Sequence, residues 1–268
     1  RRAWAAEVAL LAPGAREAER AAGALEPLVP GHLVARLDDV LARRTRAVRV
    51  VFESPGNLSN AWACLRTLDS FGLQYADVVD AQESGSKSSG SRRNGGQFDA
   101  EWNDTMAASL ASQPWVDVRR WRGPAACCAA LRAEGYRVVG THLGQGSADV
   151  RELLRELAGG AACGGDGARG APPVAVVLGN EQDGLSAEMR ASVDALAHLP
   201  MRGLAQSLNV SATCAVLLAL LDAQGWLRPA ELAPGERARL RLLWLSEACF
   251  ERSEEAAAAL REAGLGGA

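Results

Sequence analysis

The most informative stretch of the chain is Leu199-Pro200-Met201-Arg202-Gly203-Leu204-Ala205-Gln206-Ser207-Leu208-Asn209-Val210-Ser211. An apolar strand end stops at Pro200, small polar residues follow, and an apolar run at 212–218 continues as a helix. Gly203 lets the backbone come close to another group. Ser207 and Asn209 are residue types that bind the free N–H groups at a helix start. This order predicts a ligand cradle that opens a helix.

Upstream of this stretch, apolar runs typical of buried strands alternate with helical patterns. Strands are expected at 47–52, 75–79, 115–118, 136–141 and 174–179, and helices at 61–71, 124–135 and 186–195. Such alternation predicts an α/β fold with a mostly parallel sheet and helices on both faces. Residues 81–104, rich in Ser, Gly and Asn, predict a mobile insert, and the Gly-rich residues 159–170 predict a second flexible loop.

Composition limits the class of protein. The 268 residues are 48% hydrophobic and carry a net charge of −3, as expected for a soluble globular protein. The apolar run at 215–221 is far shorter than the roughly 20 residues of a membrane span. The six cysteines form no C-x-x-C pair and the three histidines lie far apart, so we expect no metal site and buried free thiols. We expect a cytoplasmic protein; because the chain begins at Arg1 without a methionine, an organelle is the alternative.

Three segments together resemble the SpoU (TrmH) family of the SPOUT class, which methylates RNA ribose 2′-hydroxyls. The first segment is Pro55–Ser59 with Ala63–Gly72, the second is Val176–Ser186, and the third is the stretch quoted above. The resemblance spans about residues 36 to 228. Residues 36–46 and 227–241 are also similar to the helical extensions of TrmH tRNA enzymes.

The resemblance implies the architecture and the partners. A SPOUT methyltransferase domain with a C-terminal trefoil knot would occupy residues 46–228, between helical extensions at 1–45 and 229–268. The implied cofactor is S-adenosylmethionine, and the implied substrate is tRNA, at guanosine 18 of the D-loop. The family works as homodimers, for which the apolar face of 210–221 is a candidate contact.

The resemblance also implies residue roles. The cofactor pocket would be lined by Leu178, Gly179, Asn180, Leu199, Met201, Ser207 and Leu208. Arg66 matches the catalytic arginine of the family, while Glu181, Ser207 and Asn209 would orient the ribose and the polar ends of the cofactor. A guanidinium stays charged in proteins, with a pKa above about 12, so Arg66 is a poor general base. We expect it to pair with an RNA phosphate and to stabilise the developing alkoxide.

Two asparagines compete for one role. The family places its motif asparagine six positions before the arginine, but Asn57 lies nine before Arg66 and Asn60 lies six before it. Either Asn60 is the functional residue, or Asn60-Ala61-Trp62 is an insertion after Asn57-Leu58-Ser59. The good fit of Asn-Leu-Ser and of Ala-Cys-Leu-Arg-Thr favours Asn57, and both are kept as catalytic candidates.

The choice of RNA depends on weaker features. Arginines gather at 43–49, 119–122 and 237–241, and because the net charge is negative, such local patches would have to contact phosphates. The alternatives are a ribosomal-RNA ribose 2′-O-methyltransferase and a catalytically impaired knotted RNA-binding protein. A generic nucleotide-binding protein is disfavoured, because the chain has no G-x-x-x-x-G-K-[ST] and no G-x-G-x-x-G after a strand.

Overall fold

The computed structural model describes residues 2–80, 115–159, 170–229 and 232–265. The insert predicted at 81–104 and most of the Gly-rich segment at 159–170 lie outside the described residues. The chain divides into two compact units. One combines Arg1–Thr45 with Arg228–Ala268, and the other is Arg46–Leu227.

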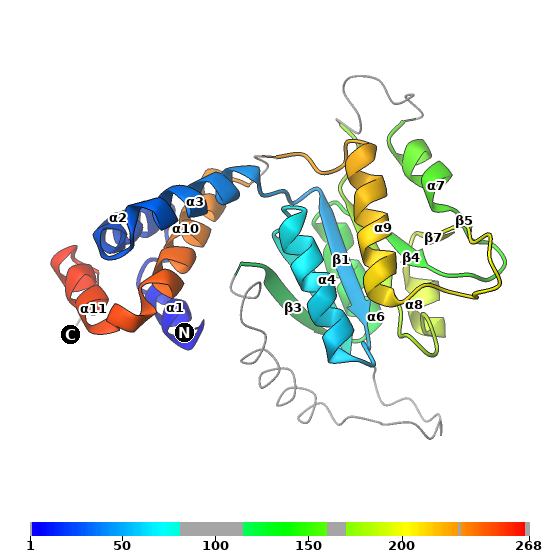
Figure 1. The fold of residues 1–268 in the computed structure, drawn as a ribbon, viewed down its shortest axis with the longest axis horizontal. Helices are drawn as coiled ribbons and strands as arrows, with labels where there is room; N and C mark the ends of the chain where they lie inside the picture. Colours follow the sequence, from blue (N-terminus) through cyan, green and yellow to red (C-terminus); the bar gives the residue numbers. More distant parts are fainter. Residues whose placement is uncertain (1, 81–114, 160–169, 230–231, 266–268) are drawn as a thin grey trace. The chain divides into compact units, whose positions relative to one another are not determined.

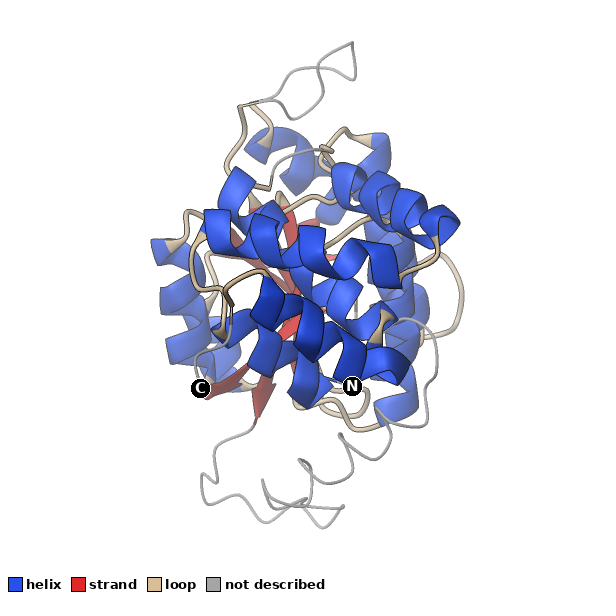
Figure 2. Cartoon of the chain, turned by 90° about the vertical axis from the view of Figure 1, so that its left-hand side faces the viewer, coloured by secondary structure: helices blue, strands red, loops and turns tan. Residues whose placement is uncertain are grey.

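The larger unit is built on a seven-stranded sheet with the order β3-β2-β1-β6-β4-β7-β5 (Figure 1). Every neighbouring pair in this sheet is parallel. The strands, red in Figure 2, are β1 (Val48–Glu53), β2 (Tyr75–Asp80), β3 (Asp117–Arg122), β4 (Arg137–Thr141), β5 (Ala148–Asp149), β6 (Val174–Leu178) and β7 (Ala195–His198). Because all seven strands run in the same direction, their carboxyl ends lie at one edge of the sheet.

Helices cover both faces of this sheet, which confirms the predicted α/β architecture. Side chains of α4 (Leu58–Ser70), α7 (Val150–Leu157) and α9 (Val210–Ala223) form one buried cluster with β1, β2, β4 and β6. Side chains of α6 (Pro124–Ala133) and α8 (Ala187–Ser192) form a second cluster on the opposite face. Helices α4 and α9 pack against each other (Figure 1), which brings the first and third motifs together.

Two predicted helix boundaries are corrected. Helix α4 begins at Leu58 rather than at Ala61, because the side chain of Asn57 accepts a hydrogen bond from Ser59 N at 2.9 Å and caps the helix. The helix expected over 186–195 ends at Ser192, and β7 begins at Ala195. Pairing of β7 with β4 and β5 outweighs the local helical pattern there.

The smaller unit is helical. It contains α1 (Arg2–Leu10), α2 (Ala15–Leu25), η1 (Glu26–Leu28) and α3 (Gly31–Arg43), together with α10 (Pro234–Ala248), η2 (Phe250–Arg252) and α11 (Ser253–Glu262). Helix α10 packs against α1, α2 and α3, and α11 packs against α2. The two terminal segments therefore bury their apolar faces against each other.

The cysteines in the described part of the chain, Cys64, Cys127, Cys128, Cys214 and Cys249, are buried free thiols. Burial raises the pKa of Cys128 and of Cys249 to about 11, so these thiols are protonated at neutral pH. None of the described helices is long and apolar enough to cross a membrane.

Candidate functional site

A cavity of about 530 Å³ opens where neighbouring strands of the sheet end. It lies beyond the carboxyl ends of β4, β6 and β7, the position where open parallel sheets bind ligands. Its wall comprises the ends of these strands, the loops 179–184 and 199–209, the first turn of α9, and Asn60 from α4. The second and third motifs, and Asn60 between the two parts of the first, therefore contribute to one cavity.

The loop after β6 is a tight turn that requires glycine at its start. A Cβ on Gly179 would lie 2.3 Å from the carbonyl carbon of Gly184, far closer than atoms can approach. The turn is closed by two backbone hydrogen bonds between Asn180 and Gly184, of 3.0 and 2.9 Å. Gly184 has a φ of 67°, a conformation that favours glycine. The conformation of this wall of the cavity is therefore set by its glycines.

Asn60, Glu181 and Asn209 form a hydrogen-bonded group at the cavity. Asn60 Nδ2 donates to Glu181 Oε1 at 2.9 Å, and Asn209 Nδ2 donates to Asn60 Oδ1 at 3.2 Å. Asn209 also caps α9, because its Oδ1 accepts from Ser211 N at 2.8 Å. Asn60 thus bridges Glu181 of the second motif and Asn209 of the third.

The carboxylate of Glu181 is held in its ionised form. Burial disfavours the charge, but hydrogen bonds from Asn60 and from backbone groups outweigh it and lower the pKa of Glu181. One of these bonds is from Gly56 N to Oε2, at 2.9 Å. At neutral pH the site therefore presents a fixed negative charge, suited to orient a hydroxyl group or a cationic ligand.

The structure brings most of the predicted site residues together. The cavity is lined by Asn60, Leu178, Gly179, Asn180, Glu181, Leu199, Met201, Ser207, Leu208 and Asn209. Asn57 and Arg66 are not among the lining residues. Asn57 uses its side chain to cap α4, and Arg66 is exposed on the same helix.

Sequence reasoning missed one wall of the cavity. Thr141, His142 and Leu143 at the end of β4 line it, together with His198 at the end of β7. Thr141 Oγ1 donates to the carbonyl of Val177 at 2.9 Å and so ties β4 to β6. The sequence pattern that could have predicted this wall is an apolar strand that ends in polar residues. The same pattern identified residues 199–211 as a ligand site.

The arginine clusters make many contacts inside the protein. Arg43 forms an ion pair with Asp39. The fully buried Arg44 lies over the ring of Trp244, at 5.2 Å from its centroid. In the tail, Arg241 Nε donates to Asp38 Oδ1 at 2.6 Å.

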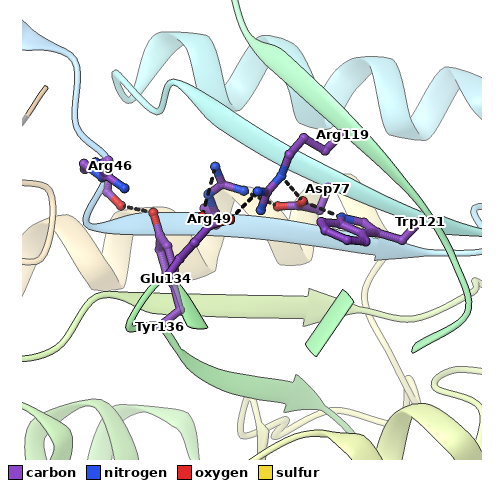
Figure 3. A network of polar contacts seen from close by, with 7 residues as sticks. All are labelled: Arg46, Arg49, Asp77, Arg119, Trp121, Glu134 and Tyr136. Carbon is purple, nitrogen blue, oxygen red and sulfur yellow. Dashed lines mark hydrogen bonds and ion pairs between the residues drawn. The ribbon is translucent and has the colours of Figure 1, made fainter. Parts of the chain in front are cut away.

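Arg49 and Arg119 belong to a buried ionic network around Asp77 (Figure 3). Asp77 is fully buried and accepts hydrogen bonds from Arg49 Nη1 and Arg119 Nε, both at 2.9 Å, and from Trp121 Nε1 at 2.7 Å. Glu134, which follows the last residue of α6, forms ion pairs with both arginines. Because Arg44 and Arg49 are buried, the expectation that they reach RNA phosphates is corrected.

Comparisons with known proteins agree with the motifs. Residues 47–219 match the model of the SpoU rRNA Methylase family. A tRNA (guanosine(18)-2′-O)-methyltransferase of Escherichia coli (strain K12) is 30% identical over 185 residues, which cover 69% of this chain and 66% of the relative. A 23S rRNA (guanosine-2′-O-)-methyltransferase of Vibrio cholerae is 28% identical over 182 residues, covering 68% of this chain and 61% of the relative.

The fold also has a solved counterpart. The crystal structure of the A. aeolicus TrmH/SpoU tRNA modifying enzyme superposes with a TM-score of 0.58 at 23% identity. The match covers 83% of this chain and 97% of that one. This coverage exceeds the Arg46–Leu227 unit, so the similarity in fold includes part of the terminal helices.

Proposed function

Since the chain belongs to the SpoU rRNA Methylase family, we propose that it methylates a ribose 2′-hydroxyl of tRNA, at guanosine 18, with S-adenosylmethionine as the methyl donor. The observation that carries the proposal is the meeting of Asn60, Glu181 and Asn209 at a cavity beyond the strand ends. Glu181 and Asn209 come from the second and third motifs of the resemblance, and Asn60 lies between the two parts of the first.

The residues at the cavity fit the proposed cofactor. A volume of about 530 Å³ lies within the range of small-molecule sites, roughly 300–1,000 Å³. Leu199 and Leu208 offer apolar surface for a nucleoside, and the ionised Glu181 offers a partner for a cation. When bound, S-adenosylmethionine supplies an electrophilic methyl group on a positively charged sulfur.

Positioning is the main task of the protein's own groups. A displacement at a methyl group needs the attacking oxygen in line, at about 3–3.5 Å, and a small error in placement is costly. Asn60 holds Glu181, Asn209 holds Asn60, and both asparagines offer amide groups to the ribose. The loop 179–184 fixes the cofactor, and Arg66 binds an RNA phosphate and stabilises the alkoxide that develops at the 2′-oxygen.

Two further features of the family are included in the proposal. Helix α9 follows β7 in the chain yet packs on α4, so the chain crosses back over the sheet after residue 198. This crossing supports the C-terminal trefoil knot.

Exposed apolar residues support a homodimer. Leu204 is fully exposed, and Leu208 and Val216 are 40% and 41% exposed.

The homodimer is checked by sedimentation equilibrium. We expect twice the mass of the 28.1 kDa chain, because exposed apolar side chains of this kind are stabilised when a second copy covers them. A Val216→Glu variant should shift the equilibrium towards monomer. A monomeric wild-type protein at micromolar concentration would contradict this assignment.

Ribosomal RNA is the second candidate substrate, because a ribosomal enzyme is among the relatives. Transfer RNA is favoured because the A. aeolicus tRNA modifying enzyme matches most of this chain in fold, including part of the terminal helices.

Ribose-methylation mapping tests the proposed function. Unmodified tRNA transcripts and 23S rRNA are each incubated with the protein and S-adenosylmethionine, and the methylated nucleotide is identified by mass spectrometry of nuclease fragments. We expect a single 2′-O-methyl group on guanosine 18 of tRNA. Methylation of rRNA alone would overturn the substrate, and cofactor binding without any transfer would indicate an impaired RNA-binding protein.

Arg66 should affect turnover without affecting cofactor binding. We expect Arg66→Ala to lower kcat/KM for tRNA by about 10- to 100-fold, the usual effect of removing a hydrogen bond to a charged group. The dissociation constant for S-adenosylmethionine, measured by calorimetry, should not change, because Arg66 does not line the cavity. Arg155→Ala, which removes an exposed arginine from α7, is the matched control. Full methylation by Arg66→Ala would exclude the assigned role.

A further inference from the structure

Glu53, the last residue of β1, is a buried carboxylate that the proposed mechanism does not use. The residue is 4% exposed. Both of its oxygens bind one residue: Oε2 accepts from Ser186 N at 2.9 Å, and Oε1 accepts from Ser186 Oγ at 2.6 Å. In the described part of the chain, no ion pair accompanies this carboxylate. A buried carboxyl group needs hydrogen-bond partners, and Ser186 supplies one for each oxygen.

Ser186 ends the loop that forms one wall of the cavity. It caps α8, because its Oγ also accepts from Met189 N at 3.0 Å. The serine hydroxyl thus donates to Glu53 and accepts from the helix, so its orientation is fixed from both sides. Two residues earlier, Gly184 closes the turn with Asn180.

The residues after Glu53 hold the rest of the same loop. Asn180 Nδ2 donates to the carbonyl of Ser54 at 2.7 Å, and Gly56 N donates to Glu181 Oε2 at 2.9 Å. Ser54 has a φ of 46°, an unusual value for a residue other than glycine, which turns the chain towards the loop. The segment 53–56 therefore fastens the loop 179–186 at two adjacent residues near its start and at its end.

Glu53 differs from the other attachments because it lies outside the cavity and is a buried carboxyl group. Neither Glu53 nor Ser186 lines the cavity, so any effect on a ligand has to pass through the loop. Burial raises the pKa of Glu53, and the hydrogen bonds from Ser186 oppose that rise. Glu188 and Arg190 of α8 also act on this carboxyl, in opposite directions.

We propose that Glu53 is a positioning residue that, through its two hydrogen bonds to Ser186, holds the loop 179–186 in the conformation that binds the cofactor. The proposal rests on the proposed function, because it takes S-adenosylmethionine as the ligand of that loop. Glu53 acts on cofactor binding and makes no contact with the reacting groups. Its removal should therefore change cofactor affinity much more than the rate at saturating cofactor.

Three variants separate the contributions. Glu53→Ala removes both hydrogen bonds, Glu53→Gln keeps the size of the side chain and one acceptor oxygen, and Ser186→Ala keeps only the backbone hydrogen bond. Asp194→Asn is the matched control, because Asp194 also accepts from a backbone N–H, Val138 N at 2.7 Å, but lies beyond the far end of α8.

Calorimetry with S-adenosylmethionine and S-adenosylhomocysteine gives the first measurement. We expect the dissociation constant to rise about 10- to 100-fold in Glu53→Ala, as for the loss of a hydrogen bond to a charged group, and to rise less in Glu53→Gln and Ser186→Ala. In tRNA methylation, KM for the cofactor should rise while kcat stays close to wild type. Asp194→Asn should bind the cofactor as the wild type does.

Amide hydrogen exchange gives a second measurement that does not depend on activity. Residues 180–186 should exchange faster in Glu53→Ala than in the wild type, while α4 and α9 should be unchanged. If Glu53→Ala fails to fold, Glu53→Gln carries the test. Wild-type cofactor affinity in folded Glu53→Gln and Ser186→Ala, or a fall in kcat alone, would overturn the proposal. If the wild type binds no S-adenosylmethionine, the proposed function fails, whereas unchanged loop exchange in the variants refutes the role of Glu53 itself.

Discussion

Replacing Asn60 with alanine is expected to lower kcat for ribose methylation by about 10²- to 10³-fold, as for other precisely placed polar groups in active sites. Asn60 donates to Glu181 at 2.9 Å and accepts from Asn209 at 3.2 Å. Without it, Glu181 loses a donor that fixes its carboxylate, and Asn209 loses an acceptor. Both changes loosen the groups that would hold the ribose, and the reaction depends on placement.

Replacing Asn57 with alanine should give the opposite pattern. Its side chain caps α4, so we expect the free energy of unfolding to fall by about 0.5–2 kcal/mol. The turnover number should stay close to wild type, because the side chain does not line the cavity. Steady-state methylation and urea denaturation of both variants measure the two effects side by side.

The contrast between the two variants decides which asparagine belongs to the motif. If Asn57→Ala abolished turnover and Asn60→Ala did not, the alignment with a three-residue insertion would be correct. Asn60→Asp is a useful companion variant, because it would place a second carboxylate beside Glu181 and raise the pKa of that pair. We expect Asn60→Asp to be less active than the wild type at neutral pH. It should regain part of its activity as the pH is lowered and one of the two carboxylates is protonated.

The sequence could not choose between the asparagines, because the answer depends on where α4 starts and on what lies opposite. The expected helix at 61–71 left both residues ahead of it. With the helix starting at Leu58, Asn57 is the cap and Asn60 lies in the first turn. The partners of Asn60 are 121 and 149 residues away in the chain, and no local pattern reports such contacts.

The strands and the cavity were easier to predict. The run Ala47–Phe52 is too apolar for the surface, and it forms β1, an interior strand of the sheet in which every residue from Val48 to Glu53 is buried. The Gly-rich turn after β6 and the polar stretch after Pro200 also line the cavity. Glycine, proline and capping residues have local conformational causes, so their patterns can be read from sequence.

The charged residues were harder to interpret. Arg49 stands within an apolar run that predicts a buried strand, but the run does not indicate the partner of the arginine. That partner, Asp77, lies 28 residues away on the neighbouring strand. Whether an arginine meets a carboxylate inside the protein or a phosphate outside depends on strand order, and strand order is not a local property of sequence.

This buried network leads to the largest stability effect that we expect. Replacing Asp77 with alanine should lower the free energy of unfolding of the Arg46–Leu227 unit by about 3–5 kcal/mol. The variant would leave the guanidinium of Arg49, 4% exposed, with Glu134 at 3.7 Å as its ion-pair partner within the described chain. Arg119 and Trp121 would lose the same acceptor. The rings of Tyr75 and Tyr136, 4.6 and 5.4 Å from the Arg49 guanidinium carbon, replace only part of that stabilisation.

Asp80→Ala is the matched control for this measurement. Asp80 lies three residues further along β2 and forms an ion pair with Arg120 of β3 at 2.9 Å. The side chain of Asp80 is 31% exposed and that of Arg120 is 30% exposed. Such a pair contributes about 0–1 kcal/mol, because water already solvates both charges. Urea denaturation followed by tryptophan fluorescence, with Trp121 as a reporter beside the network, compares the two variants. Equal losses would mean that the Asp77 network contributes no more than a surface ion pair, so that the burial of Arg49 is supported by packing on the two tyrosines instead.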